Sequence, residues 1–148
     1  IVNGGIVVTD DLARPHERNQ VHPSNKRPVG RRLAYLALNR DYGFSSVNCY
    51  SPEAQEAWVE GDMVCVKLSY AQNGLDRWEG VKGLEVCGED GVFYPVSEAL
   101  YDWDHVLKIR CEKVKRPVEV RYCYRDFNPG NLHNTVGLPV APFRFRFE

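Results

Sequence analysis

The residues best suited to chemistry lie in one polar loop, Val21-His22-Pro23-Ser24-Asn25-Lys26. This loop directly precedes a segment with the pattern of an amphipathic helix. A helix can anchor such a loop and hold an imidazole at the mouth of a cleft, which is a usual way to present a catalytic base. His22 is therefore the candidate general base. The alternative is a loop histidine that only hydrogen-bonds to backbone groups.

The candidate acidic partners of His22 lie in the preceding segment. Asp10 and Asp11 follow a short apolar run and could orient an imidazole. Alternatively, one of them caps the following turn and the other is solvated. Asn19 lies three residues before His22, but a neutral amide does not stabilise an imidazolium as a carboxylate would.

A nucleophile is not evident in this chain. The start Ile1-Val2-Asn3-Gly4-Gly5 is similar to the activated N-terminus of a trypsin-like protease, but the chain lacks a Gly-Asp-Ser-Gly segment and is too short for two barrels. It also lacks a Gly-x-Ser-x-Gly motif, which Gly43-Phe44-Ser45-Ser46-Val47 does not match. If His22 is a base, its serine is expected outside these residues. Because the chain begins Ile-Val, we interpret its start as a boundary made by processing, proteolysis or cloning.

Composition limits the class of partner. The 148 residues are 43% hydrophobic with a net charge of −1, which indicates a globular chain with a real core. No basic stripe is evident, so nucleic acid is not an expected partner. No apolar run approaches the roughly 18 residues of a membrane helix, so no membrane association is expected.

Neither metals nor disulfides are indicated. His16 and His22 are too far apart in sequence for a simple local metal site, and no Cys-x-x-Cys motif suggests zinc. The five cysteines are odd in number and stand in strand-like runs, so we expect reduced, structural thiols. One disulfide remains an alternative in an oxidising compartment.

The periodicity divides the chain near residue 48. Before it, the apolar run 6–9 predicts a buried strand, and residues 12–23 predict a loop. Ser24 or Asn25 is expected to cap a helix that tolerates Pro28 in its first turn and ends near Gly43. Strand, functional loop and helix form an α/β unit, which gathers ligands at the carboxyl ends of its strands.

Beyond that point the pattern changes to a period of two. Alternation over 55–59, 63–70, 105–111 and 118–124, with a hairpin over 84–95, predicts a small antiparallel sandwich with His105 on a strand. Residues 128–147 have no regular period but many apolar anchors, so this tail is expected to pack across another surface. His133 in the tail is assigned no role.

Several blocks resemble the sialate O-acetylesterases. They are Asp11-Leu12, residues 21–26, residues 29–34, Gly83-Leu84-Glu85-Val86-Cys87-Gly88-Glu89-Asp90-Gly91-Val92-Phe93-Tyr94-Pro95, residues 117–122, residues 131–134 and residues 137–144. They lie in family order and span nearly the whole chain.

The resemblance implies a serine esterase of the SGNH-like class that removes O-acetyl groups from sialic acids or related glycans. Residues 1–48 would be the C-terminal portion of the esterase domain, and residues 49–148 a β-sandwich whose tail packs back on it. His22 would be the catalytic histidine and Asp11, or else Asp10, its acid, although the family's Asp-x-x-His spacing is not met. No cofactor is implied.

The same resemblance implies an extracytoplasmic protein: periplasmic, secreted or lysosomal. The serine and oxyanion donors would lie in an N-terminal part of the same esterase, possibly a separate cleaved chain, so this chain alone is expected to be inactive.

The alternative function is a stand-alone carbohydrate-binding or scaffolding sandwich. Trp58, Trp78 and Trp103 could stack on sugar rings, with Trp78 the one most expected to be exposed. Packing inside the sandwich is the competing explanation for these side chains.

Overall fold

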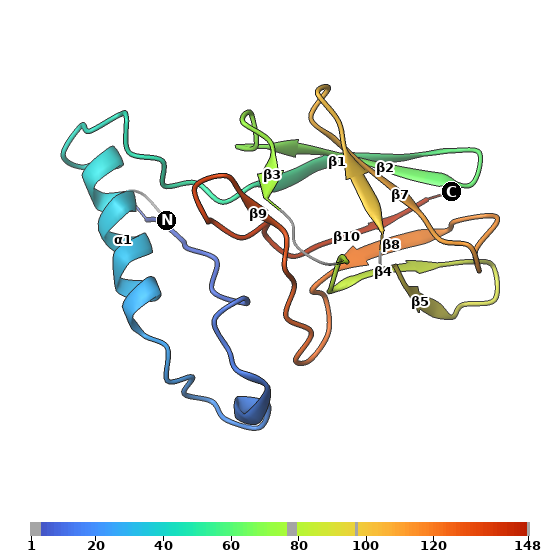
Figure 1. The fold of residues 1–148 in the computed structure, drawn as a ribbon, viewed down its shortest axis with the longest axis horizontal. Coiled ribbons are helices and arrows are strands. Elements are labelled where there is room, and N and C mark those ends of the chain that lie inside the picture. Colours follow the sequence, from blue (N-terminus) through green and yellow to red (C-terminus); the bar gives the residue numbers. More distant parts are fainter. Residues whose placement is uncertain (1–3, 77–79, 97, 148) are drawn as a thin grey trace.

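The structure is a computed structural model that describes residues 4–76, 80–96 and 98–147. It places a helical N-terminal unit, residues 4–48, beside a body of antiparallel sheets (Figure 1). Trp78 lies outside the described residues.

The predicted helix is confirmed as α1 (Arg27–Arg40), with Pro28 in its first turn. Gly43 follows its end with φ of +72°, a conformation that glycine adopts without strain. The expected cap at Ser24 or Asn25 is wrong, since Lys26 precedes the first turn and its side chain makes no capping bond. The Ser24 backbone is instead engaged by the carboxylate of Glu17, which ends the short 3₁₀ helix η1 (Pro15–Glu17).

The expected strand over residues 6–9 does not form in the described chain. The segment runs extended with no ladder partner, and Ile6 is 87% exposed rather than buried. Arg32 and Arg40 of α1 bind the carbonyl oxygens of Val8 and Gly4 instead. A strand needs a neighbour to bond its backbone groups, and no described segment offers one here. The described residues therefore do not show the expected α/β edge, and within residues 4–48 an extended segment lies beside a helix.

The sandwich is confirmed. One four-stranded sheet has the order β1-β2-β7-β6 and the other β10-β8-β4-β5, with every pairing antiparallel. The first comprises β1 (Glu53–Glu60), β2 (Met63–Ser69), β7 (Val106–Arg110) and β6 (Ala99–Tyr101). The second comprises β10 (Phe143–Arg146), β8 (Glu119–Tyr122), β4 (Leu84–Cys87) and β5 (Phe93–Pro95).

Buried side chains from both sheets form one core. Val66 and Leu107 of the first sheet and Val120 of the second are fully buried within it. Alternation along each strand sends these apolar residues inward, as the sequence predicts. The Asp90-Gly91 turn of the predicted hairpin is also present, with φ of +73° at Gly91.

Two expectations for the β-region need correction. His105 is not on a strand: it occupies a turn before β7 with φ of +64°. The tail is not irregular throughout, because it contributes β10 and β9 (His133–Asn134), which pairs with β3 (Leu75–Asp76). Its anchors, among them Leu132 and Val140, lie in the sandwich core. All five cysteines are free, as expected for reduced structural thiols.

Candidate active-site loop and the residues that hold it

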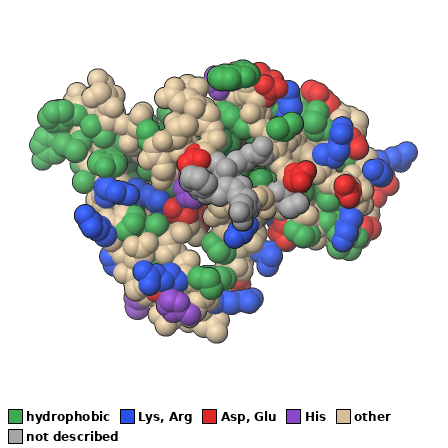
Figure 2. Space-filling view, in the orientation of Figure 1, with side chains coloured by type: hydrophobic (Ala, Val, Ile, Leu, Met, Phe, Trp, Pro, Cys, Tyr) green, Lys and Arg blue, Asp and Glu red, His purple; other side chains and the backbone are tan. Residues whose placement is uncertain are grey.

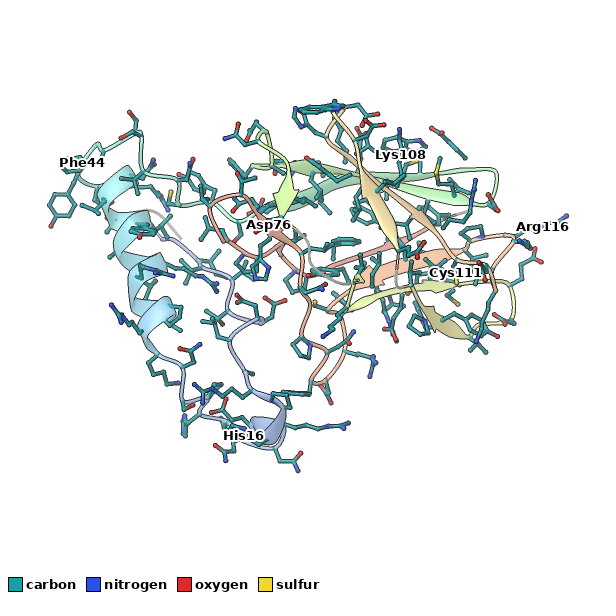
Figure 3. The ribbon with its side chains drawn as sticks, in the orientation of Figure 1. His16, Phe44, Asp76, Lys108, Cys111 and Arg116 are labelled. Atoms are coloured by element: carbon teal, nitrogen blue, oxygen red, sulfur yellow. The ribbon has the colours of Figure 1, made fainter. Side chains whose placement is uncertain are left out.

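His22 lies exposed on the loop between η1 and α1. Figure 3 labels the nearby His16 at the far end of the N-terminal unit. The side chain is therefore accessible to a ligand or to another polypeptide. It makes no hydrogen bond to a carboxylate or a serine hydroxyl among the described residues.

Glu17 fixes the backbone on both sides of His22. Its buried carboxylate accepts hydrogen bonds from the backbone N–H of Ser24 at 2.8 Å and of Arg14 at 2.9 Å. A hydrogen bond with the Ser24 side chain, followed by these backbone bonds from Arg14 and Ser24, lowers the pKa of Glu17 to about 2, so its carboxylate is ionised at neutral pH. A buried glutamate thus closes the loop around the candidate base. Sequence reasoning missed it, and the only signal was an acidic residue in the turn after Pro15.

Asp11 lies in a different group of charges. Its carboxylate accepts two hydrogen bonds from the guanidinium of Arg32, Nη1 to Oδ1 at 2.7 Å and Nη2 to Oδ2 at 2.6 Å. Nε2 of His133 lies 3.2 Å from the same Oδ2. The side chains of Arg32 and Asp11 are only 7% and 10% exposed, so the pair is nearly dry.

The pKa values of this group follow from its contacts. Burial opposes ionisation of Asp11, but the bonds from Arg32 and His133 outweigh it and hold the pKa of Asp11 at about 2. The hydrogen bond with Asp11 raises the pKa of His133 against the opposing effect of its burial. Asp11 is therefore a buried anion bound by two basic side chains.

This group joins the two parts of the chain. Asp11 comes from the N-terminal segment, Arg32 from α1, and His133 from β9, which lies next to the N-terminal unit in Figure 1. The structure thus brings Asp11 to His133 and not to His22. The predicted pairing of Asp11 with His22 stays a prediction and requires Asp11 to leave these partners.

Asp10 is not the solvated residue of the alternative interpretation. Its Oδ1 atom is buried and has no hydrogen-bond partner within the described part of the chain. Burial is the main cause that raises the pKa of Asp10. Neither aspartate is thus a simple exposed turn residue.

The N-terminal unit has exposed apolar side chains and an open groove at its surface. Gly5 packs so closely on Leu36 that a Cβ would lie 2.5 Å from its Cδ2, whereas Ile6 faces solvent. An open groove of about 540 Å³ separates residues 6–10 from the sandwich at Glu53, Ala54 and residues 141–143. Further exposed apolar side chains of this unit are Val21, Leu33, Tyr42 and Phe44. Figure 2 shows hydrophobic side chains gathered at the end where Figure 3 labels Phe44.

No helix in the described residues is both long and apolar enough to cross a membrane. No cluster of three or more His, Cys, Asp or Glu side chains able to hold a metal ion occurs in residues 4–76, 80–96 and 98–147.

Comparison with known proteins gives a likeness to a solved structure. No protein-family model matches the sequence, and no curated protein matches it. Among solved structures, a carbohydrate acetylesterase from Xanthomonas citri is similar over 96% of this chain, with 30% sequence identity and a TM-score of 0.82. The chain spans about a third of the length of that esterase chain, 32%. At this identity and coverage the likeness supports a relationship to carbohydrate esterases.

Proposed function

We propose that this chain is the histidine-bearing part of a serine carbohydrate O-acetylesterase, with residues 1–48 belonging to an SGNH-like esterase domain. The observation that carries the proposal is the likeness to a carbohydrate acetylesterase over nearly the whole chain. The exposed position of His22, on a loop held by Glu17, suits a base that acts on groups outside this chain. The finer substrate that we propose is an O-acetylated sialic acid or a related glycan.

The proposed chemistry divides between this chain and a further N-terminal part. A serine of that part attacks the acetyl carbonyl, and His22 accepts the serine proton. The carbonyl oxygen becomes an oxyanion held by donors of the same part. His22 then protonates the departing sugar oxygen, which leaves as a hydroxyl. Water, deprotonated by His22, attacks the acyl-serine, and His22 returns the proton to the serine oxygen as acetate leaves. Asp11 is the proposed acid partner if docking frees it from Arg32 and His133.

The surface of the N-terminal unit supports the proposal of a further N-terminal part. The extended segment 6–9 has no strand beside it in the described chain, and Ile6 is 87% exposed. Leu33 on α1 is another exposed apolar side chain of this unit. Open backbone edges and exposed apolar side chains are features that a strand of another segment can cover. We propose that the N-terminal part supplies this strand, either within one polypeptide or as a cleaved chain.

The test begins with native mass spectrometry of the protein from its source, followed by assays of acetate release. The complex with the N-terminal part should release acetate from acetylated glycans, and the isolated 148-residue chain should not. His22→Ala should lower the rate of the complex at least about a hundredfold, the lower range for a general base. His16→Ala, an exposed histidine six residues earlier, is the matched control and should retain activity.

Three results would count against this proposal. They are full activity of the isolated chain, full activity of His22→Ala in the complex, and the absence of any associated or contiguous serine-bearing part. Comparison of O-acetylated sialic acid with acetylated xylan as substrates tests the finer proposal. The extracytoplasmic location is tested separately, by fractionation of the source cells.

The second candidate function is carbohydrate binding by the sandwich alone. It is favoured by Trp103, whose side chain stands 96% exposed on a turn of the sandwich. It predicts sugar binding by the isolated chain and no release of acetate from any complex.

A further inference from the structure

A small groove opens on the sandwich, between the loop before β3 and the turn between β6 and β7. It has a volume of about 180 Å³, and its lining includes Gln72, Asn73, Tyr101, Asp102 and Trp103. Figure 3 labels Lys108, which binds Asp102 of this groove, and His16, close to the candidate base, on opposite sides of the molecule. The groove is therefore separate from the His22 loop.

The turn that presents Trp103 is held by several hydrogen bonds. The N–H of His105 donates to the Asp102 carbonyl at 3.0 Å, and the Asp102 N–H donates to the Val106 carbonyl at 3.1 Å. The Asp102 carboxylate accepts a bond from the Trp103 N–H at 2.7 Å. The indole thus projects from a fixed backbone, which lowers the entropy lost when a ligand binds to it.

The loop before β3, which forms the opposite wall of the groove, is also held by hydrogen bonds. The Gly74 N–H donates to the Ala71 carbonyl at 2.9 Å, and Gly74 has φ of +92°. The hydroxyl of Tyr101 donates to the same Ala71 carbonyl at 3.1 Å, which ties this loop to β6. Gln72 and Asn73 on this loop are exposed, and their side-chain amides make no hydrogen bond within the described residues.

An exposed tryptophan contributes little to the core, and Trp58 differs from Trp103 in this respect. Trp58 is half-buried and donates its indole N–H to Glu60 at 2.7 Å, and Trp78 is not described. At 96% exposure, Trp103 offers a whole aromatic face to a ligand. Its indole N–H remains available as a donor.

We infer that this groove binds a neutral pyranose ring, with Trp103 stacked on the apolar C–H face of the sugar. Sugar rings present C–H groups on a face and hydroxyls around the edge. The amides of Gln72 and Asn73 can both donate to and accept from such hydroxyls. The Asp102 carboxylate can accept one more. A flat aromatic side chain beside a few fixed polar groups matches this mixed surface.

The charges of the turn select against an acidic sugar. Asp102 and Asp104 both bind the ammonium of Lys108, at 2.9 and 3.6 Å, so two carboxylates face one cation. The hydrogen bond from Lys108 lowers the pKa of Asp102, which is therefore ionised at neutral pH. An anionic sugar would add a third negative charge to this turn. The inferred site does not depend on the proposed esterase activity.

The test is a titration of the ¹⁵N-labelled chain with neutral xylo-, cello- and manno-oligosaccharides, followed by NMR. The indole N–H signal of Trp103 should shift in a saturable manner with at least one of them, and the signal of Trp58 should not. Trp103→Ala should weaken binding at least about tenfold, which corresponds to about 1.4 kcal/mol. Asn73→Ala should weaken it by a smaller factor.

Leu100→Ala is the matched control, because Leu100 is a 66% exposed apolar side chain on β6 outside the groove lining. It should bind as the unchanged chain does. The inference is overturned if none of the three neutral sugars gives a saturable shift or if Trp103→Ala binds as tightly as the unchanged chain. It is also overturned if an anionic sugar, sialyllactose, binds more tightly than every neutral one. Backbone amide spectra of each variant establish that the sandwich is still folded.

Discussion

Replacing Arg32 by methionine should open the N-terminal unit locally, by separating α1 from the segment that contains Asp11. Arg32 donates two hydrogen bonds to Asp11 and one, at 2.7 Å, to the Val8 carbonyl. The Arg32 and Asp11 side chains are 7% and 10% exposed, so Asp11 would become a buried anion without its main partner. Removing one partner of a buried pair costs about 3–5 kcal/mol.

The lower end of this range applies here, because His133 still contacts Asp11 in the variant. A loss of about 3 kcal/mol corresponds to a roughly hundredfold larger population of the opened unit. Only Arg32 and Leu36 are buried on α1, so the helix has little other support. The opening should therefore be local, with the sandwich core intact.

Native-state amide hydrogen exchange measures both effects at once. The amides of α1 should exchange roughly a hundredfold faster in Arg32→Met, whereas Val66 and Leu107 of the sandwich should keep their protection. Arg110→Met is the control, since Arg110 forms an exposed ion pair with Asp62 that contributes at most about 1 kcal/mol. A change of less than tenfold in the exchange of α1 would refute the reasoning, as would equal loss of protection in both units.

Three further predictions concern the pH dependence of stability, the tight packing at Gly130 and the loop that contains His22. The pKa of His133 is raised in the folded chain. Its contribution to the contact between the N-terminal unit and the sandwich should therefore be fully present below its unfolded pKa of about 6.5. This contribution should be lost as the pH rises through the pKa of the folded state. The pKa of Asp11 is lowered to about 2, so its contribution should be present above its unfolded value of about 3.9 and be lost as pH falls toward 2. Gly130→Ala should destabilise the sandwich by about 1–3 kcal/mol in urea unfolding, because a Cβ would overlap the Tyr122 hydroxyl. Glu17→Gln should speed amide exchange at Ser24, since the N–H groups of Arg14 and Ser24 bind different carboxylate oxygens, and a neutral amide keeps only one oxygen, which is a weaker acceptor.

The following variants and outcomes test these predictions. His133→Gln should remove the alkaline part of the pH dependence, and an unchanged profile would contradict the role of His133. Gly30→Ala meets no atom within 4 Å on the surface of α1, so it should stabilise the chain by about 0.5–1 kcal/mol, opposite in sign to Gly130→Ala. For Glu17→Gln, exchange at Ser24 as slow as in the unchanged chain would show that the carboxylate does not hold the loop.

Local sequence pattern was sufficient to predict the strands of the sandwich, its hairpin turn and the helix. The apolar and polar alternation around Val66 and Leu107 predicts strands with one face in a core, and the Asp90-Gly91 turn predicts the hairpin. The amphipathic spacing after Pro28 predicts α1. These signals are local because side-chain alternation and turn conformation depend on a few neighbouring residues.

The cap and the first strand could not be predicted in that way. Ser24 has the right chemistry for a helix cap, but its backbone is engaged by Glu17, seven residues earlier. The run around Ile6 has strand composition, yet a strand exists only when a second segment bonds to it. In both cases a competing partner, or the lack of one, decides the outcome.

The sequence alone determined the sandwich, the helix and the choice of His22 as the candidate base. Only the tertiary structure decided that Asp11 meets Arg32 and His133, that Glu17 closes the His22 loop, and that Trp103 faces solvent. The Asp11 contact with His133 joins residues 122 positions apart. Sequence spacing contains no information on such a contact, because the path of the sandwich brings His133 to the N-terminal unit. Burial then fixes the charges there, by removing the water that would otherwise screen them.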